Sequence, residues 1–277
     1  MTDIVKRLSR DYLALGSLAV IGITLLAGLL APWLALHDPN QVDVLHKYAS
    51  PSLEYPLGAD QLGRCIYSRL LYGIQTTVFL SLLTMGATIT VGVFFGLAAG
   101  SFRGWVDESL MRLCDVMLSF PSQVMILAIV GMLGVGIGNV VLANILVKWA
   151  WYTRMIRSLV LKYSEKNYIL FSRATGSSRR FILSEHLLPN AAPEIIILAT
   201  LDTGWVILNL SALSFLGLGV QAPTAEWGAM LSEAQKVMTI HPEQMLAPGL
   251  AILILVAAFN LLGDSLRDAL DPKEECR

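Results

Sequence analysis

Long apolar stretches alternate with shorter polar ones along the whole chain. An α-helix needs about 20 mostly apolar residues to cross a bilayer, and several stretches are of that order. They are residues 13–34, 76–100, 107–134, 139–161, 191–218 and 246–262. The pattern predicts an all-α, polytopic membrane protein with six transmembrane helices.

The polar stretches divide the chain into segments. The first apolar stretch follows Lys6, Arg7 and Arg10 and has no small-residue cleavage site at its end. It is therefore interpreted as an uncleaved helix rather than a signal peptide. The predicted segments are a cytoplasmic N-terminus (1–10), a first transmembrane helix (11–35), a periplasmic segment (36–75), a transmembrane domain (76–272) that contains a loop at 163–190, and a C-terminal tail (273–277).

Composition and charge agree with a membrane location. The 277 residues are 55% hydrophobic and 15% charged, with a mean hydropathy of +0.62, which is too apolar for a soluble domain. With the N-terminus inside, fifteen Lys and Arg fall on the cytoplasmic side and four on the outer side. This asymmetry predicts that both termini and the loop at 163–190 are cytoplasmic.

The loop at 163–190 is polar and basic between two apolar stretches. Residues 168–174 are predicted to form a short helix, and Gly176 can take the left-handed conformation that ends it. Ser177 or Ser178 can cap a second helix, which Pro189 is predicted to stop. Such an element lies in water and offers a surface onto which another protein can dock.

The spacing within this loop carries a family resemblance. Nine residues separate Gly176 from His186-Leu187-Leu188-Pro189, which resembles the coupling loop of ATP-binding-cassette importer permeases (E-A-A, three residues, G, nine residues, I-x-L-P). Leu170-Phe171-Ser172 stands in place of E-A-A, so no role is assigned to an acidic residue. The variant found here is similar to the peptide/nickel branch of the family. The resemblance implies a role in ATPase coupling for Tyr168, Arg173, Ala174, Thr175, Gly176, Ser177, Arg179, His186 and Pro189.

Further motifs similar to the same branch cover most of the chain. They are 56–64 with Ser68, Arg69 and Gly73; Asp107, 110–112, Asp115 and Phe120-Pro121; 214–219, Pro223, 226–228 and Met230; and Asn260 with 263–272. The sequence departs from the family pattern at Cys65, where an aspartate is common, and at Thr224, where a second proline is common. The resemblance implies the fold of a type I importer permease.

Two features of the apolar stretches bear on helix packing. Gly92, Gly96 and Gly100 form a stripe of small residues that lets another helix approach closely. The stripe fits packing inside the subunit or an interface between subunits. Pro121 predicts a kink in the third transmembrane helix.

The chain lacks the sequence signatures of an enzyme. It contains no G-x-x-x-x-G-K-[ST] phosphate loop, no H-E-x-x-H and no G-x-S-x-G. We expect a non-catalytic translocation subunit without a cofactor of its own, with ATP and Mg bound by two partner ATPase subunits. The resemblance also implies a second, homologous permease in a heterodimer, a periplasmic solute-binding protein and a bacterial inner membrane. No nucleic-acid partner is expected.

Three charged residues are candidates for the translocation path. Asp202 lies near the middle of the fifth apolar stretch, where a lone carboxylate costs about 2.5 to 3.5 kcal/mol. It is expected to face a cavity or to be hydrogen-bonded to a neighbouring helix. Lys148 can snorkel or face the path, and Asp115 is placed to pair with Arg112 three residues before it.

The sequence motifs indicate the substrate less clearly than they indicate the family. Residues 148–159, 198–202 and 222–228 resemble nickel permease subunits more than dipeptide ones, so nickel, free or chelated, is the first hypothesis and a di- or oligopeptide the alternative. His37, His46 and His241 are metal-ligand candidates, but imidazoles without paired spacing are typical of ordinary loop residues. A secondary transporter would also show several spans and an intramembrane Asp202, yet it would carry inverted repeats, which the sequence does not show.

Overall fold

The computed structural model describes residues 7–270. Residues 1–6 of the predicted N-terminal segment and the predicted tail at 273–277 lie outside the described part. The helices are α2 (Tyr12–Leu29), α3 (Ala31–Leu34), η1 (Val44–His46), α4 (Ile66–Ile74), η2 (Gln75–Phe79), α5 (Leu80–Phe102), α6 (Gly104–Leu118), α7 (Ser122–Leu133), α8 (Ile137–Ser164), α9 (Asn167–Ala174), α10 (Arg179–Phe181), η3 (Ile182–Leu187), α11 (Leu188–Phe215), α12 (Trp227–Gln235), η4 (Pro242–Met245) and α13 (Leu246–Leu270).

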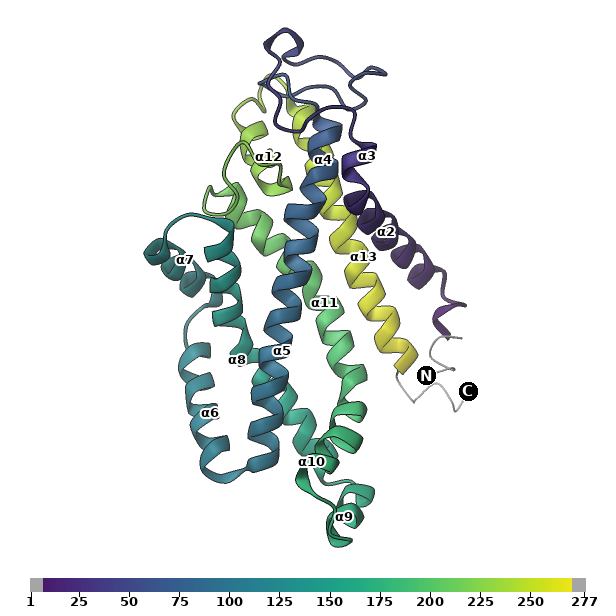
Figure 1. Cartoon of the computed structure of the whole chain (residues 1–277), viewed down its shortest axis with the longest axis vertical. Coiled ribbons are helices and arrows are strands. Elements are labelled where there is room, and N and C mark those ends of the chain that lie inside the picture. The colour runs from purple at the N-terminus through teal and green to yellow at the C-terminus, as the bar shows by residue number, and fades with distance from the viewer. Residues whose placement is uncertain (1–6, 271–277) are drawn as a thin grey trace.

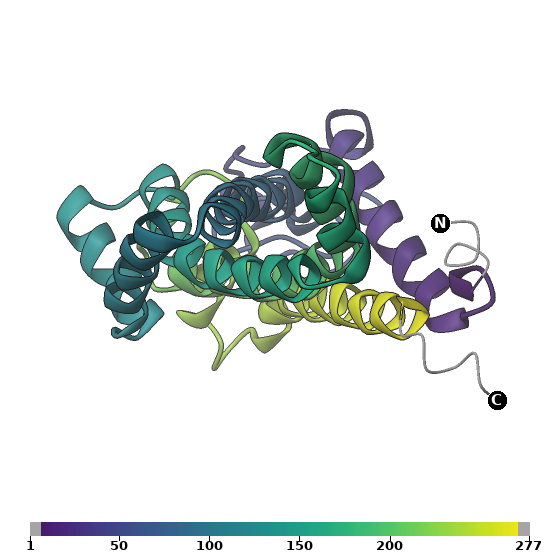
Figure 2. The same ribbon diagram turned by 90° about the horizontal axis from the view of Figure 1, so that it is seen from below.

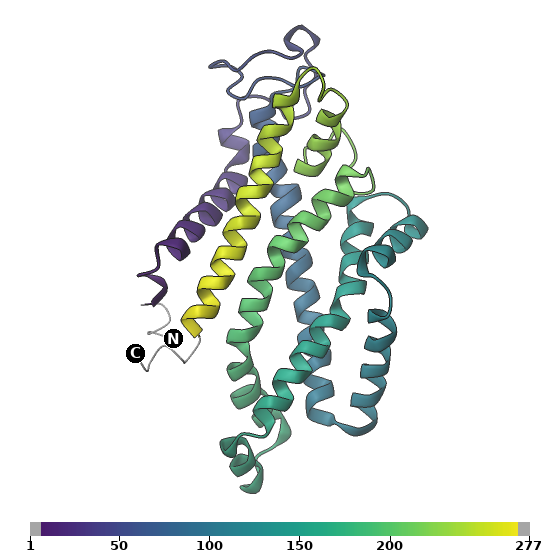
Figure 3. The same cartoon turned by 180° about the vertical axis from the view of Figure 1, so that it is seen from behind.

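The long helices form an elongated bundle with two distinct ends. The loops of residues 35–65 and α12 lie at one end, here called the outer end, and α9 lies at the other, the inner end (Figure 1). Viewed from the inner end, α6 and α7 lie on one side of the bundle and α2 on the opposite side (Figure 2). Helix α13 packs between α2 and α11 (Figure 3).

Within residues 7–270 the protein is helical, and its only bridge between extended segments joins Ala59 to Cys65. The apolar side chains pack into one large cluster around α5, α8 and α11 and a second around α4, α11 and α13. The all-α prediction is therefore confirmed for this part of the chain.

Four helical runs of the described region are long and apolar enough to cross a membrane. They are Tyr12–Leu29, Ile66–Phe102, Arg179–Phe215 and Pro242–Leu270. A fifth arises if Gly104–Leu118 and Ser122–Leu133, which meet at 85°, are counted as one span. The predicted fourth span corresponds to α8, a helix of 28 residues that carries Lys148, Arg154 and Arg157. The count of six spans therefore stays a prediction.

The second helical run begins earlier than predicted. It starts at Ile66 rather than Thr76, so the last part of the predicted periplasmic segment is helical. The polar residues of this stretch predicted a loop, but in the fold they have hydrogen-bond partners. The Gln75 amide donates to the Gly28 carbonyl at 2.8 Å, and the Ser68 hydroxyl accepts from the His37 backbone N–H at 3.1 Å.

The glycine stripe packs inside the subunit. A Cβ atom on Gly96 would lie 2.8 Å from Ile156 Cβ, and one on Gly100 would lie 2.6 Å from a Val160 methyl group. Gly92 faces Tyr152 in the same way. Since all three contacts are with α8, the stripe allows the close approach of α5 and α8 rather than an interface with another subunit.

The kink expected at Pro121 is a full break. Helix α6 ends at Leu118, α7 begins at Ser122, and the two helices enclose 85°. Proline has no backbone N–H and disfavours a helical conformation for the residue before it. In the structure Pro121 is extended (φ −59°, ψ 124°) and precedes the first residue of α7.

Candidate coupling loop and translocation path

The loop at 163–190 has the predicted glycine hinge. Helix α9 ends at Ala174, and Gly176 follows with φ +83°, a conformation that favours glycine. The Gly176 N–H donates to the Arg173 carbonyl at 3.1 Å, and the Ser177 N–H donates to the Ser172 carbonyl at 3.1 Å. Between the two serines proposed as caps, it is Ser178 that caps the next helix, because its hydroxyl accepts from the Phe181 N–H at 3.3 Å.

Pro189 does not stop the second helix, contrary to the sequence prediction. The helical run continues from Arg179 to Phe215, with the π-helical segment η3 immediately before Pro189. Proline at the first turn of a helix costs little, and a π-helical turn relieves the clash that its ring would otherwise make with the preceding turn. The second half of the loop at 163–190 therefore continues directly into α11.

Aromatic contacts hold the two halves of the loop together. The His186 ring meets the Tyr168 ring edge to face at 6.0 Å and the Phe181 ring at 5.4 Å between centroids. Ile169 and Leu187 are buried beneath them. The three residues in place of E-A-A differ in exposure: Ser172 is buried, whereas Leu170 and Phe171 are 49% and 71% exposed. The loop thus presents apolar side chains outward from a packed base.

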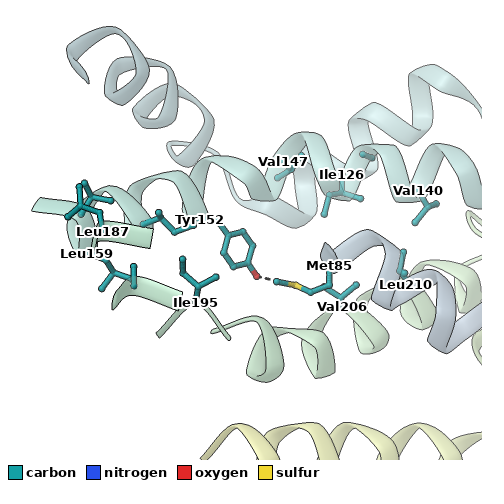
Figure 4. Close-up of a cluster of buried hydrophobic side chains, with 14 of the residues drawn as sticks. Met85, Ile126, Val140, Val147, Tyr152, Leu159, Leu187, Ile195, Val206 and Leu210 are labelled. Atoms are coloured by element: carbon teal, nitrogen blue, oxygen red, sulfur yellow. Dashed lines mark hydrogen bonds between the residues drawn. The ribbon is translucent and has the colours of Figure 1, made fainter. Parts of the chain in front are cut away.

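Asp202 is hydrogen-bonded to a neighbouring helix. Its carboxylate on α11 accepts from the Tyr152 hydroxyl on α8, and the same hydroxyl lies 3.6 Å from the Met85 sulfur on α5 (Figure 4). Lys148, one turn before Tyr152, places its ammonium 3.5 Å from the centroid of the Trp205 ring, a cation–π contact. Asp202 and Lys148 therefore lie in one region between α8 and α11.

Asp115 pairs with a different arginine from the one predicted. Its carboxylate accepts a hydrogen bond from Arg154 of α8, whereas Arg112 lies 3.9 Å from Glu108 on the surface of α6. A second pair of the same kind joins Asp107 to Arg157, with one contact of 2.7 Å. Both pairs link α6 to α8, so Asp115 takes part in this helix contact, whereas Asp202 contacts Tyr152.

The three outer histidines make aromatic contacts. His37 and His46 both stack on Tyr55, with centroids at 4.6 and 5.1 Å, and His241 stacks on Tyr48 at 4.1 Å. The hydrogen bond between His46 and Asp43 lowers the pKa of the Asp43 carboxyl. In the part of the chain that the structure describes, no group of three or more His, Cys, Asp or Glu side chains is arranged to hold a metal ion.

A buried charge cluster at the outer end was missed in the sequence. Arg64 contacts Asp60 at 2.7 Å and Glu233 of α12 at 2.6 Å, and Arg69 of α4 contacts the same Glu233 carboxylate at 3.1 Å. Both arginine side chains are 1% exposed. Buried arginines require carboxylate partners, but the burial of Arg64 and Arg69 is visible only in the structure, so the sequence alone provides no signal for the partner on α12.

The start of α12 is fastened to the π-helical turn η2. Glu226 caps α12 by accepting from the Ala229 N–H at 2.7 Å and also accepts from the Thr77 hydroxyl at 3.0 Å. The Thr76 hydroxyl donates to the Ala225 carbonyl at 2.5 Å. Burial raises the pKa of the Glu226 carboxyl. Glu226, which belongs to one of the motifs shared with the family, therefore attaches the start of α12 to η2.

Comparisons with known proteins agree with this architecture. Residues 92–275 match the family described as binding-protein-dependent transport system inner membrane component, and residues 1–51 match the N-terminal TM domain of oligopeptide transport permease C. The metal-staphylopine import system permease protein of Staphylococcus aureus is 43% identical over 270 residues, which are 98% of this chain and 93% of that protein.

Two further relatives come from Escherichia coli. The nickel transport system permease protein is 40% identical over 256 residues, 92% of this chain and 92% of the relative. The glutathione transport system permease protein is 39% identical over 269 residues, 97% of this chain and 89% of the relative. All three are named as permease proteins of import or transport systems. The chain belongs to the peptide/nickel branch of the binding-protein-dependent permeases, the membrane components of ATP-binding-cassette importers.

Proposed function

We propose that this chain is one of two homologous membrane-spanning halves of an importer that takes up nickel, free or chelated, across a bacterial inner membrane. The coupling loop carries the proposal. It is an ordered element at the inner end whose base is packed and whose exposed face presents Leu170 and Phe171. Exposed apolar residues of this kind are typical of a protein interface, and two ATPase subunits are the partners that the family supplies.

The proposed topology has six crossings and both termini in the cytoplasm. The four apolar runs supply four crossings, and helix α8 and the bent pair of α6 and α7 would supply the other two. The excess of Lys and Arg toward the inner end supports this orientation. The outer end, with residues 35–65 and α12, would then face the periplasmic solute-binding protein.

Nickel is favoured by the named relatives. Of the three relatives compared, one is a nickel transport permease and another a metal-staphylopine import permease, whereas the third is a glutathione transport permease. A peptide such as a dipeptide is the second candidate. The two are separated by uptake of radioactive nickel and of a labelled dipeptide in cells that have the complete transporter and in cells that lack only this chain.

Loss of nickel uptake with dipeptide uptake unchanged is the expected result. The lost uptake should return when the chain is supplied again from a plasmid. Loss of dipeptide uptake alone would overturn the nickel proposal while leaving the permease assignment standing.

The proposed path runs between α8 and α11 past Lys148 and Asp202. Polar side chains continue along the same helices: Asn144 lies one turn before Lys148, and Asn209 two turns after Asp202. Among the described residues, the side-chain nitrogen and oxygen of Asn209 and the side-chain oxygen of Asn144 are buried without a hydrogen-bond partner. Polar groups buried in a membrane are energetically costly and typically mark a functional site, which supports a path along this stripe.

Asp202→Asn is expected to lower uptake about tenfold, as the loss of a hydrogen bond to a charged group of about 1.5 kcal/mol would do. The amount of permease in the membrane should not change, because the amide keeps the shape of the side chain. Glu194→Gln is the matched control, since Glu194 is also on α11 but contacts Lys162 at 3.0 Å near the inner end. Full uptake by Asp202→Asn would show that Asp202 serves packing alone.

A further inference from the structure

We propose that a pocket at the inner end binds the phosphate of an anionic phospholipid from the inner leaflet. The pocket lies between the α5–α6 turn and the coupling loop and has a volume of about 380 Å³. Its polar lining consists of three arginines, Arg103, Arg173 and Arg179, together with Ser101 and Ser177. The proposal rests on the proposed orientation, in which the inner end faces the cytoplasm.

The arginines of the pocket carry charge that the protein itself does not neutralise. Throughout residues 7–270, no carboxylate lies within ion-pair distance of Arg103, Arg173 or Arg179. The acidic side chains nearest in sequence to the turn are already engaged, since Asp107 pairs with Arg157 and Glu108 lies 3.9 Å from Arg112. Three arginines that line one pocket without a counter-charge form a site for an anion, and the planar donors of a guanidinium suit phosphate oxygens.

Neutral donors complete the site. The Ser101 hydroxyl is buried and, among the described residues, has no hydrogen-bond partner. A buried hydroxyl left without a partner costs about 1 to 3 kcal/mol, so a ligand oxygen at this point would relieve that cost.

The backbone of Arg103 is strained. It has φ +49° and ψ −173°, a conformation that residues other than glycine rarely adopt. The strained turn therefore holds an arginine where glycine would fit the backbone better.

The surroundings of the pocket favour a lipid over a free anion. Phe102, at the end of the apolar helix α5, and Leu183 of η3 both line the pocket. Trp105, which follows in the same turn, is 81% exposed. Exposed aromatic residues at the end of a membrane helix lie at the level of the lipid headgroups, and basic pockets between helices on the cytoplasmic side bind anionic headgroups. An acyl chain could extend from this pocket along α5.

The test is retention of phosphatidylglycerol by the purified complete transporter, measured by native mass spectrometry. The double variant Arg103→Gln/Arg179→Gln should bind phosphatidylglycerol about 30-fold more weakly, at about 1 kcal/mol for each basic residue near the membrane surface. Arg103→Lys/Arg179→Lys should retain most of the affinity because it keeps the charge. Arg112→Gln is the matched control, an exposed arginine of the adjacent helix that does not line the pocket.

Two competition experiments identify whether the bound phosphate belongs to a lipid or is a free anion. Phosphatidylcholine should not replace phosphatidylglycerol, and inorganic phosphate should not displace it. Displacement by inorganic phosphate would overturn the lipid assignment in favour of a free anion, and equal binding by the double variant and the wild type would overturn the site altogether. Because bound lipid is measured rather than uptake, failure of this proposal is distinguishable from failure of the proposed transport function.

Discussion

Glu233→Ala is expected to prevent stable folding of the outer end of this permease. The substitution leaves Arg64 and Arg69, both 1% exposed, with Asp60 as the one remaining carboxylate of the cluster. Removing one partner of a buried ion pair costs about 3 to 5 kcal/mol because the other charge stays buried. Such a loss is a large part of the about 5 to 15 kcal/mol that stabilises a typical protein.

The cluster joins parts of the chain that are far apart in sequence, which is why a large effect is expected. It connects the 35–65 segment to α4 and both to α12, and Arg69 also donates to the Pro39 carbonyl at 3.2 Å and the Pro223 carbonyl at 3.1 Å. The amount of folded permease in membranes and its thermal unfolding in detergent are the measurements. Lys236→Ala is the control, an exposed position just after α12. Unchanged unfolding of Glu233→Ala would show that the arginines are not held by this carboxylate.

Gly176→Pro is expected to uncouple ATP hydrolysis from transport in an otherwise assembled transporter. Proline fixes φ near −65° and has no N–H, whereas Gly176 has φ +83° and donates to the Arg173 carbonyl. The substitution therefore disrupts the turn between α9 and α10 without touching the packed helices. Stimulation of ATP hydrolysis by the loaded binding protein should be lost, and uptake with it.

Gly176→Asn is the matched control for this experiment. Asparagine tolerates a positive φ better than other side chains, and no atom lies within 4 Å of the position that a Cβ would take at Gly176. This variant should keep most of the coupled activity. Normal coupling in Gly176→Pro would remove the basis for assigning a mechanical role to the loop.

Local features of the fold were predictable from the sequence. The helix at 168–174, the left-handed Gly176 and a serine cap after it all follow from preferences of single residues, and the structure has each of them. The long apolar helices follow from composition in the same way. A kink at Pro121 also follows from the ring of a single residue, although the full break between α6 and α7 and its 85° angle do not.

Features that depend on tertiary partners were not predictable. Pro189 indicated a helix end, but the π-helical segment before it allows the helix to continue into α11. Ser68, Arg69 and Gln75 indicated a loop, yet each finds a partner inside the fold. Asp115 was paired with a neighbour on its own helix, whereas its partner Arg154 lies 39 residues away. Sequence spacing cannot identify partners at such separations.

The central claim is that ATP on the side of the coupling loop drives import through this chain. The most direct test is accumulation of radioactive nickel by vesicles containing the purified complete transporter, with the binding protein on the outer side and ATP on the side of α9. Accumulation should require both ATP and this chain, and should be absent with ADP. Accumulation without ATP, driven by an ion gradient alone, would contradict the account and indicate a secondary transporter.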